Sequence, residues 1–205
     1  MKRYECLKAI APLIKDELFV TSAGGATSEW CAAHPGDGNL QVKTLGLCSS
    51  IGLGLALALP RRKVFVFDGD GALWMNLGSL ATIGLHRPKN LIHICWDNRQ
   101  YESSGGEPTV SSAGGINFAE IARGAAIKST RAVTTVEELV EAVRHALDHD
   151  GPHFIWARID AGRAEVPPLP MDELENKYRF VRYVEATEGI SILKVPMPTS
   201  YLQKH

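Results

Sequence analysis

Two short groups of small polar residues each follow directly on a run of apolar residues. The first is Gly69-Asp70-Gly71 and the second is Asp97-Asn98, with 25 residues between them. Glycines let backbone N–H groups come close to a ligand, and a following helix can present its N-terminus to an anion. Carboxylate and amide oxygens are ligands that suit Mg²⁺. The two groups therefore indicate a metal site beside an anionic ligand, although Gly, Asp and Asn are also common in ordinary turns.

Such a site requires strands that bring both groups to the same edge of a sheet. Apolar runs at residues 63–67 and 91–96 predict two buried parallel strands, and shorter strands are expected at 18–21 and 153–159. The helices expected between the strands span residues 4–18, 47–59, 76–86, 118–126, 135–148 and 172–183. This alternation predicts an α/β fold, a three-layer, doubly wound and mainly parallel sheet with helices on both faces. Ligands of such sheets bind beyond the carboxyl ends of the strands, where both polar groups lie.

Composition narrows the class of protein. The 205 residues include 22 basic and 23 acidic ones, which gives no electrostatic reason to expect nucleic acid or a membrane surface as a partner. The four cysteines are far apart and form no C-x-x-C pair, so neither a zinc nor an iron–sulfur site is indicated. The longest apolar run, residues 51–59, is too short to span a bilayer, and no signal peptide is seen. We expect a cytoplasmic protein with reduced thiols.

The spacing of the two polar groups resembles the G-D-G…N-N pattern of thiamine diphosphate enzymes, with Asp97 in place of the first asparagine. Three longer segments, GDGALWMNLGSLATIG, DNRQYESSGGEPTVSSAGGINFAEIARGAA and DELENKYRFVRYV, resemble the thiamine diphosphate-dependent decarboxylases of sulfopyruvate and phosphonopyruvate. The resemblance extends to about Val184 and is greatest to a separate beta subunit. It implies a thiamine diphosphate-binding fold, of the diphosphate-binding type, over residues 1–188, with residues 189–205 as a C-terminal tail.

The resemblance implies the site residue by residue. Asp70 and Asn98 would bind Mg²⁺ through their side chains, and Gln100 would bind it through its carbonyl group. The residues implied to contact thiamine diphosphate are Gly25, Thr27, Ser28, Lys43, Leu45, Gly69, Asp70, Gly71, Ala72, Asn98, Gln100 and Tyr101. Ala72 departs from the family, because many relatives carry a hydroxyl group there that would contact the diphosphate.

Three residues are candidates for direct contact with the reacting groups. The resemblance places Leu45 beneath the cofactor as the apolar residue that keeps it bent. Tyr101 and Ser104 belong to a Gly-, Ser- and Thr-rich stretch at residues 102–115. Long loops of this kind beside a site are often lids, so we expect this segment to order over cofactor and substrate.

Thiamine diphosphate enzymes need a carboxylic acid beside the pyrimidine ring, and the resemblance assigns that glutamate to a second domain that is not found in this sequence. Glu29, Glu102 and Glu107 lie near the expected site but in the wrong segments. We therefore expect a pyrimidine-binding, alpha-type partner subunit that supplies the activating glutamate, together with self-association. The expected function is the thiamine diphosphate- and Mg²⁺-binding subunit of a decarboxylase for a small 2-oxoacid.

Several alternatives remain open from the sequence. Another split thiamine diphosphate enzyme, such as one resembling acetolactate synthase, would carry the same residues, and so would a cofactor-binding homologue without activity. A dinucleotide-binding protein is disfavoured because no G-x-G-x-x-G follows the first strand. The spacing of His145, His149 and His153 is compatible with a metal site, but near the end of a helix imidazole also complements the helix dipole, and we expect a structural role. The identity of the 2-oxoacid, and whether the product is an aldehyde or a ketol, are not predicted.

Overall fold

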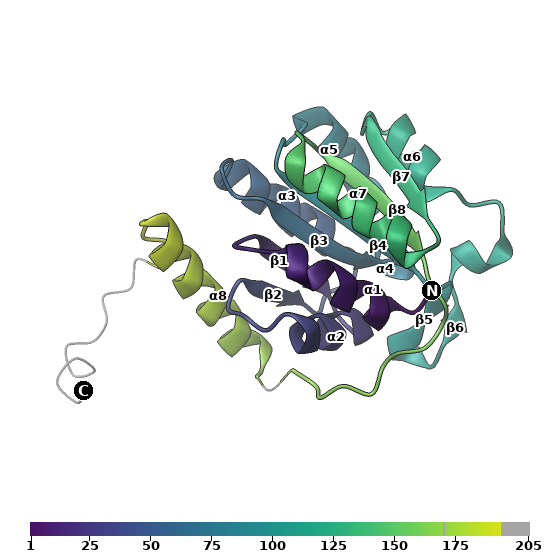
Figure 1. The fold of residues 1–205 in the computed structure, drawn as a ribbon, viewed down its shortest axis with the longest axis horizontal. Coiled ribbons are helices and arrows are strands. Elements are labelled where there is room, and N and C mark those ends of the chain that lie inside the picture. The colour runs from purple at the N-terminus through teal and green to yellow at the C-terminus, as the bar shows by residue number, and fades with distance from the viewer. Residues whose placement is uncertain (170, 194–205) are drawn as a thin grey trace.

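The computed structural model describes residues 1–169 and 171–193, and its centre is a parallel sheet of six strands in the order β2-β1-β3-β4-β8-β7 (Figure 1). The strands are β1 (Leu18–Ser22), β2 (Asn39–Val42), β3 (Val64–Gly69), β4 (Leu91–Asp97), β7 (Ser129–Val133) and β8 (His153–Arg158). The central strands β3 and β4 are buried on both faces, which explains why they consist of nearly continuous apolar residues. Their register pairs Gly69 with Trp96, so Asp70 and Asp97 follow at the same edge of the sheet.

Helices cover both faces of the sheet, which confirms the predicted three-layer α/β architecture. One face carries α1 (Arg3–Ile10), α2 (Gly25–Ala33) and α7 (Val136–Asp148). The other face carries α3 (Cys48–Ala58), α4 (Asp70–Met75), α5 (Ser79–His86), α6 (Phe118–Gly124) and α8 (Glu173–Glu188). Successive residues of β3 contribute to opposite cores: Phe65 and Phe67 pack on the α1 side, and Val64 and Val66 pack on the α3 side.

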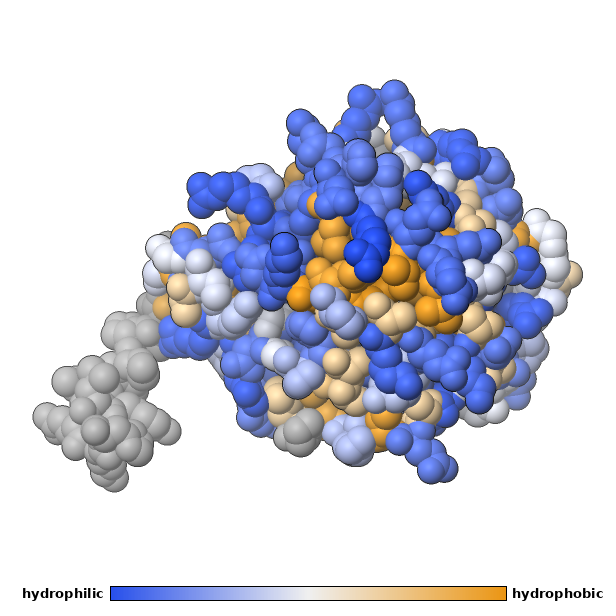
Figure 2. Space-filling model, viewed as in Figure 1, coloured by the Kyte–Doolittle hydropathy of each residue, from blue (hydrophilic) through white to orange (hydrophobic). Residues whose placement is uncertain are grey.

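The surface over α1 and α7 is partly apolar. Figure 2 shows hydrophobic residues gathered where these helices cross in front of the sheet, with charged residues around them. Leu13, Val136, Val140 and Leu147 are half-buried side chains at the edge of the core on this side. Within the described residues, no helix combines the length and apolar character that a membrane crossing requires.

Local sequence signals explain several helix ends. The side chain of Asn117 caps α6 by accepting a hydrogen bond from the Glu120 N–H at 3.1 Å. Thr135 and Glu138 form the predicted capping box at the start of α7. The predicted boundaries of α6 and α7 are confirmed to within two residues, and α3 ends two residues before Pro60 as expected.

Other predicted elements were wrong. The opening helix ends at Ile10 rather than Leu18, because Pro12 turns the chain into a short 3₁₀ segment, η1 (Ala11–Leu13). The helix predicted at residues 76–86 begins three residues later, as α5 at Ser79, and a separate short helix, α4, precedes it at residues 70–75. The last helix extends five residues beyond its predicted end and packs against β2 instead of belonging to an extended tail. Residues 194–205 of the predicted C-terminal tail lie outside the described residues.

Several elements were not predicted. The edge strands β2 and β7 were missed because they are only partly buried and lack the apolar runs that reveal a central strand. Helix α2 was missed because its small residues resemble a turn. The predicted loop at 102–115 contains short ordered pieces: the β5–β6 hairpin (Gln100–Tyr101 with Glu107–Pro108) and the 3₁₀ segments η2 (Glu102–Ser104) and η3 (Val110–Ala113).

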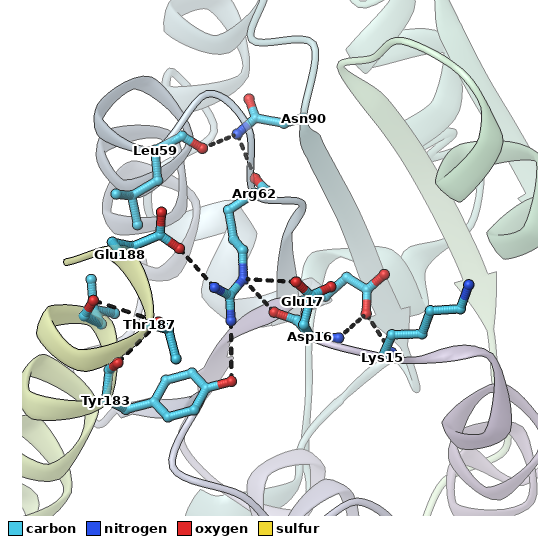
Figure 3. A network of polar contacts seen from close by, with 10 residues as sticks. Lys15, Asp16, Glu17, Leu59, Arg62, Asn90, Tyr183, Thr187 and Glu188 are labelled. Carbon is cyan, nitrogen blue, oxygen red and sulfur yellow. Dashed lines mark hydrogen bonds and ion pairs between the residues drawn. The ribbon is translucent and has the colours of Figure 1, made fainter.

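Polar side chains tie the helices together at the amino ends of the strands (Figure 3). Arg62 donates to the Asp16 carbonyl oxygen, to Glu188 at 2.7 Å and to the Tyr183 hydroxyl group at 3.1 Å. The side-chain amide of Asn90 lies within hydrogen-bond distance of three carbonyl oxygens, at 2.7 to 3.0 Å. This network anchors α8 and the loop before β3, on the edge of the sheet opposite to the two polar groups.

Candidate functional site

The two polar groups meet in a cavity at the carboxyl ends of β1, β3 and β4. The cavity is lined by Arg3, Ser22, Ala23, Gly25, Ala26, Leu45, Gly69, Asp70, Gly71, Ala72, Trp96, Asn98, Gln100, Tyr101, Glu102, Ser103 and Ser104. The structure thus brings together ten of the residues implied by the sequence: Gly25, Leu45, Gly69, Asp70, Gly71, Ala72, Asn98, Gln100, Tyr101 and Ser104. Of the implied residues, Thr27, Ser28 and Lys43 do not line this cavity.

Asp70 is the buried acid of the cavity. It begins α4 directly after β3, is 1% exposed, and accepts a hydrogen bond from the Thr109 hydroxyl group. Burial raises the pKa of Asp70 to about 6, the Thr109 hydrogen bond opposes this rise, and the charge of Asp97 adds to it. A desolvated carboxylate of this kind is stabilised by a cation, so Asp70 fits the role of a ligand for a hard metal ion.

The turn after β4 holds the amide of Asn98 at the cavity wall. Asn98 is 5% exposed, and its side-chain oxygen accepts the N–H of Gln100 at 3.0 Å. Asp97 faces away from the cavity, where one carboxylate oxygen accepts the Arg99 N–H at 3.2 Å and the other accepts the Trp156 indole N–H at 2.8 Å. Asp97 therefore braces the turn, and Asn98 is the residue of the pair that can reach a metal ion.

The two glycines of the Gly69-Asp70-Gly71 group have different roles. A Cβ atom added at Gly69 would meet no atom within 4 Å, so the missing side chain keeps the cavity open. A Cβ atom added at Gly71 would lie 2.7 Å from Cδ1 of Tyr101 and 3.0 Å from Cγ2 of Thr109. Gly69 leaves room for a ligand, whereas Gly71 leaves room for the segment that follows β4.

The N-terminus of α2 forms another part of the cavity wall, separate from the turn that carries Asn98. Gly25 and Ala26 line the cavity, and Gly24 precedes them with a φ of 106°, a conformation that favours glycine. The unpaired backbone N–H groups at the start of a helix attract anions. The predicted role of the Thr27 hydroxyl group as a donor to the diphosphate does not fit, because it is buried and donates to the Ser22 carbonyl oxygen at 2.7 Å.

Two other implied residues lie outside the cavity wall. The Lys43 side chain is exposed and forms an ion pair with Glu173 at 3.3 Å, so the contact that the resemblance implies for Lys43 is one made by its backbone. Ser28 is half-buried in α2, three residues after Gly25, and does not line the cavity. For this reason we assign ligand contacts at this wall to the first turn of α2 rather than to the hydroxyl groups.

Arg3 is a site residue that the sequence analysis missed. Its guanidinium group contacts both oxygens of Glu29, at 2.8 and 3.2 Å, and one oxygen of Glu102 at 3.0 Å. Glu29 also accepts the Ala164 N–H at 2.8 Å. This buried arginine joins α1, α2 and η2 around the cavity, and the N-terminus lies beside β5 and β6 in Figure 1. Only the fold brings residue 3 near residue 102, and no local motif marks it.

Two polar atoms around the cavity have no hydrogen-bond partner among the described residues. They are Oε1 of Glu102 and Nε1 of Trp96, and both are buried. Buried polar atoms are nearly always paired, so unpaired ones indicate a place where a ligand or water binds. Together with Asp70, the open space at Gly69 and the start of α2, these atoms fit a cavity that binds a metal ion and an anionic cofactor.

The three histidines form no comparable site. The structure gives His149 a contact with the His145 carbonyl oxygen at 2.9 Å and His153 a contact with the Ser129 hydroxyl group at 2.8 Å. Among the described residues, no group of three or more His, Cys, Asp or Glu side chains is arranged to hold a metal ion. These contacts support the structural interpretation of the histidines.

Comparison with known proteins connects this cavity to one family. The family described as "Thiamine pyrophosphate enzyme, C-terminal TPP binding domain" matches residues 26–157. The chain is 36% identical over 176 residues to phosphonopyruvate decarboxylase of Streptomyces viridochromogenes, and this match covers 84% of the chain but only 44% of that protein. It is 33% identical over 186 residues to sulfopyruvate decarboxylase subunit beta of Methanococcus maripaludis, a match that covers 90% of the chain and 98% of that subunit.

A solved structure supports the fold independently. A thiamin diphosphate-dependent enzyme from Mycobacterium smegmatis superimposes with a TM-score of 0.64, at 17% identity, over 78% of this chain and 32% of that one. Of the two relatives named above, the chain spans less than half of the phosphonopyruvate decarboxylase and nearly the whole length of the beta subunit.

Proposed function

The chain belongs to the thiamine pyrophosphate enzyme family through its C-terminal-type cofactor-binding domain, and we propose that it is the thiamine diphosphate- and Mg²⁺-binding subunit of a 2-oxoacid decarboxylase of the sulfopyruvate or phosphonopyruvate type. Thiamine diphosphate and thiamine pyrophosphate are the same compound. The observation that carries the proposal is the meeting of Asp70, Asn98 and the first turn of α2 in a single cavity. The domain that performs this role is proposed to span residues 1–188.

In this proposal each part of the cavity has a task. The side chains of Asp70 and Asn98 and the carbonyl group of Gln100 hold Mg²⁺, and the N–H groups of the first turn of α2 hold the diphosphate. Ala72 carries no hydroxyl group, so its contact is through the backbone alone. When bound, thiamine diphosphate supplies the electron sink that allows a 2-oxoacid to lose CO₂. Leu45, half-buried in the cavity wall, supports the cofactor from below.

The activating acid is proposed to come from a partner subunit. Glu29 is 1% exposed and fully engaged by Arg3 and Ala164, so it has no free oxygen for a pyrimidine ring. Glu107 is exposed on β6 and does not line the cavity. The 98% coverage of a protein named subunit beta supports an alpha-type, pyrimidine-binding partner for this chain. Each complete site then lies between two chains, and we propose that the pairs associate further.

The segment that follows Asn98 and Gln100 is proposed to be a lid. Tyr101 packs over Gly71, Ser104 lines the cavity, and Glu102 is tied to Arg3. These contacts support a position for residues 101–104 over the cavity. Tyr101 and Ser104 are therefore the residues of this chain best placed to touch a substrate.

Calorimetric titration of thiamine diphosphate with Mg²⁺ tests the proposal. The full chain is titrated alone and together with a pyrimidine-type subunit, beginning with the alpha subunit that accompanies the matched beta subunit. Asp70→Ala should reduce cofactor affinity at least ~100-fold, since loss of even an outer-shell partner costs 10–100-fold. Asp37→Ala, a surface residue paired with Arg179, is the control and should bind normally.

The reaction is then measured as CO₂ release from sulfopyruvate, phosphonopyruvate and pyruvate. Release of CO₂ only in the mixture, with an aldehyde as the product, supports a split decarboxylase. A ketol product would favour the acetolactate synthase-like alternative. Cofactor binding without turnover of any acid, in the presence of a partner that binds the chain, would overturn the proposed activity and favour a non-catalytic homologue.

A further inference from the structure

A second hollow lies behind the turn that carries the metal ligands. Side chains of the turn alternate: Asn98 and Gln100 line the cofactor cavity, while Asp97 and Arg99 line two adjoining hollows of about 270 and 260 Å³. Both hollows share Asp97, Arg99 and Arg158, and neither shares a lining residue with the cofactor cavity. The other lining residues are Ser111, Ser112, Gly114, Gly115, Ile116, Thr134, Trp156, Ile159 and Asp160. We refer to the two together as the rear hollow.

The two arginines of the rear hollow are available to an anion. Arg99 and Arg158 form no ion pair within residues 1–169 and 171–193. Asp97 also lines the hollow, and its two oxygens accept the Arg99 backbone N–H and the Trp156 indole N–H. Asp160 is paired with the amino group of Met1 at 3.2 Å. Two arginines therefore line one space, and neither is paired with the carboxylates of the described residues around it.

The arginines are also constrained. The guanidinium carbon of Arg158 lies 5.5 Å from the centroid of the Trp156 ring, a cation–π contact that orients the group. Arg99 has a φ of 61°, in the left-handed region that non-glycine residues seldom adopt. Strained backbone of this kind is found preferentially at ligand sites, where the surrounding structure maintains it.

Glycines keep the space beside the arginines open. Gly114 and Gly115 have φ values of 78° and 75°, so the chain bends around the hollow without side chains that would fill it. The serines of this wall are engaged elsewhere, because the Ser112 hydroxyl group donates to the Thr109 carbonyl oxygen at 2.7 Å and the Ser111 hydroxyl group lies beside Asp70. The guanidinium forks are therefore the donors that match the oxygens of a tetrahedral anion.

From these observations we propose that the rear hollow is a binding site for a small tetrahedral oxyanion of phosphate or sulfonate chemistry, held between Arg99 and Arg158. The site is distinct from the proposed cofactor site and does not depend on decarboxylase activity. An anion there bridges the turn that carries Asn98 to the far end of the loop at 111–115. Inorganic phosphate and methanesulfonate represent the two possible sources.

Two tryptophans provide separate reporters for the two sites. Trp96 lines the cofactor cavity and Trp156 lines the rear hollow. Indole N–H signals of the ¹⁵N-labelled full chain are followed by NMR while phosphate, methanesulfonate or, as an ionic-strength control, chloride is added. Trp156→Phe assigns the relevant signal. Saturable movement of the Trp156 signal with either oxyanion, but not with chloride, is expected, and the stronger of the two oxyanions identifies the preferred chemistry.

Substitutions localise the binding. Arg99→Gln and Arg158→Gln should each weaken binding at least ~10-fold, since each removes a charge-assisted contact. Arg87→Gln is the matched control, because Arg87 is also exposed, also has a positive φ of 49°, and likewise forms no ion pair with the described residues. All three positions are exposed, so the folded spectrum should be retained. Three results would overturn the proposed site. The first is movement of the Trp96 signal alone, and the second is a response that does not saturate. The third is an equal loss of anion affinity in Arg87→Gln.

Discussion

The two ends of the parallel strands use buried polar groups in opposite ways. At the amino ends, Arg62 and Asn90 are surrounded by partners and connect α8 to the sheet (Figure 3). At the carboxyl ends, Trp96 and Glu102 each leave a buried polar atom without a partner, and burial raises the pKa of Asp70. The first arrangement is typical of polar groups that only stabilise a fold. The second carries a free-energy cost that a bound ligand would remove, as expected where function overrides stability.

The difference between the two ends of the strands is tested most strongly by substituting two arginines. Arg3 lies at the carboxyl ends and Arg62 at the amino ends. Arg3→Met should lower the free energy of unfolding by roughly 3–5 kcal/mol, because it leaves Glu29 buried and unpaired. Arg62→Met should cost only about 2 kcal/mol, because its partners are a carbonyl group, a hydroxyl group and a carboxylate closer to solvent. Urea unfolding measures both values.

Cofactor affinity separates the two arginines further. Calorimetry should show weaker thiamine diphosphate binding after Arg3→Met and unchanged binding after Arg62→Met, since only Arg3 lines the cavity. Arg3→Lys keeps the charge and serves if Arg3→Met fails to fold. Equal loss of cofactor affinity at both positions would contradict the proposed difference between the two ends.

The pH dependence of stability isolates Asp70. The pKa of Asp70 in the folded chain is about 6, against an ordinary value of 3.8 for an aspartate. Between pH 4 and 6 the folded chain therefore holds a proton that the unfolded chain has lost. The contribution of Asp70 to the free energy of unfolding should fall through this window as pH rises, by on the order of 2–3 kcal/mol.

Asp70→Asn removes this titration. The variant should be more stable than the natural chain at pH 7 by a similar amount, equally stable near pH 4, and unable to bind Mg²⁺ tightly. Urea unfolding at several pH values measures the difference, and Asp16→Asn at the opposite end of the sheet is the control. A variant that is less stable than the natural chain at pH 7 would show that Asp70 contributes to folding rather than to ligand binding.

Neighbouring glycines allow a finer test within the cavity. Gly71→Ala should destabilise the chain by about 1–3 kcal/mol, because its Cβ would press on Tyr101 and Thr109. Gly69→Ala should change stability by less than ~0.5 kcal/mol, because its Cβ would meet open space. Thermal unfolding measures stability, and calorimetry should show that Gly69→Ala nevertheless weakens cofactor binding. Normal cofactor binding by Gly69→Ala would mean that the open space is not part of the site.

The features that could be predicted from sequence are those that local physics determines. The apolar runs of β3 and β4 and the capping box at Thr135 each act over a few residues, and these predictions agree with the structure. The spacing also placed Asp70 and Asn98 at one edge, because parallel strands end together. Edge strand β2 could not be predicted in this way, since partly polar strands depend on their neighbours for stability.

Contacts between residues that are distant in the sequence explain the remaining differences between the predicted and the observed site. Arg3 reaches the cavity only because α1 packs beside α2, and nothing in the first ten residues signals a partner at position 102. Thr27 is of the right type and in the right segment to bind a diphosphate, yet the neighbouring Ser22 carbonyl oxygen engages its hydroxyl group. Residue types thus predicted which segments meet at the cavity, and the packing of distant elements decided which of their side chains remain free to bind a ligand.

The smallest expected effect concerns the contact between Arg3 and the proposed lid. Glu102 and Glu188 form a matched pair: each accepts from a buried arginine, and their side chains are 15% and 14% exposed. Glu102→Gln should cost about 1 kcal/mol or less, because Arg3 keeps Glu29 as a partner. The affected contact holds residues 101–104 over the cavity, so amide hydrogen exchange in this segment should become several-fold faster. Glu188→Gln should leave that exchange unchanged and accelerate exchange at the end of α8 instead.

If Glu102→Gln leaves exchange at 101–104 unchanged, the segment is held by Tyr101 and Thr109 alone, and Arg3 stabilises the α1–α2 contact without controlling access to the site.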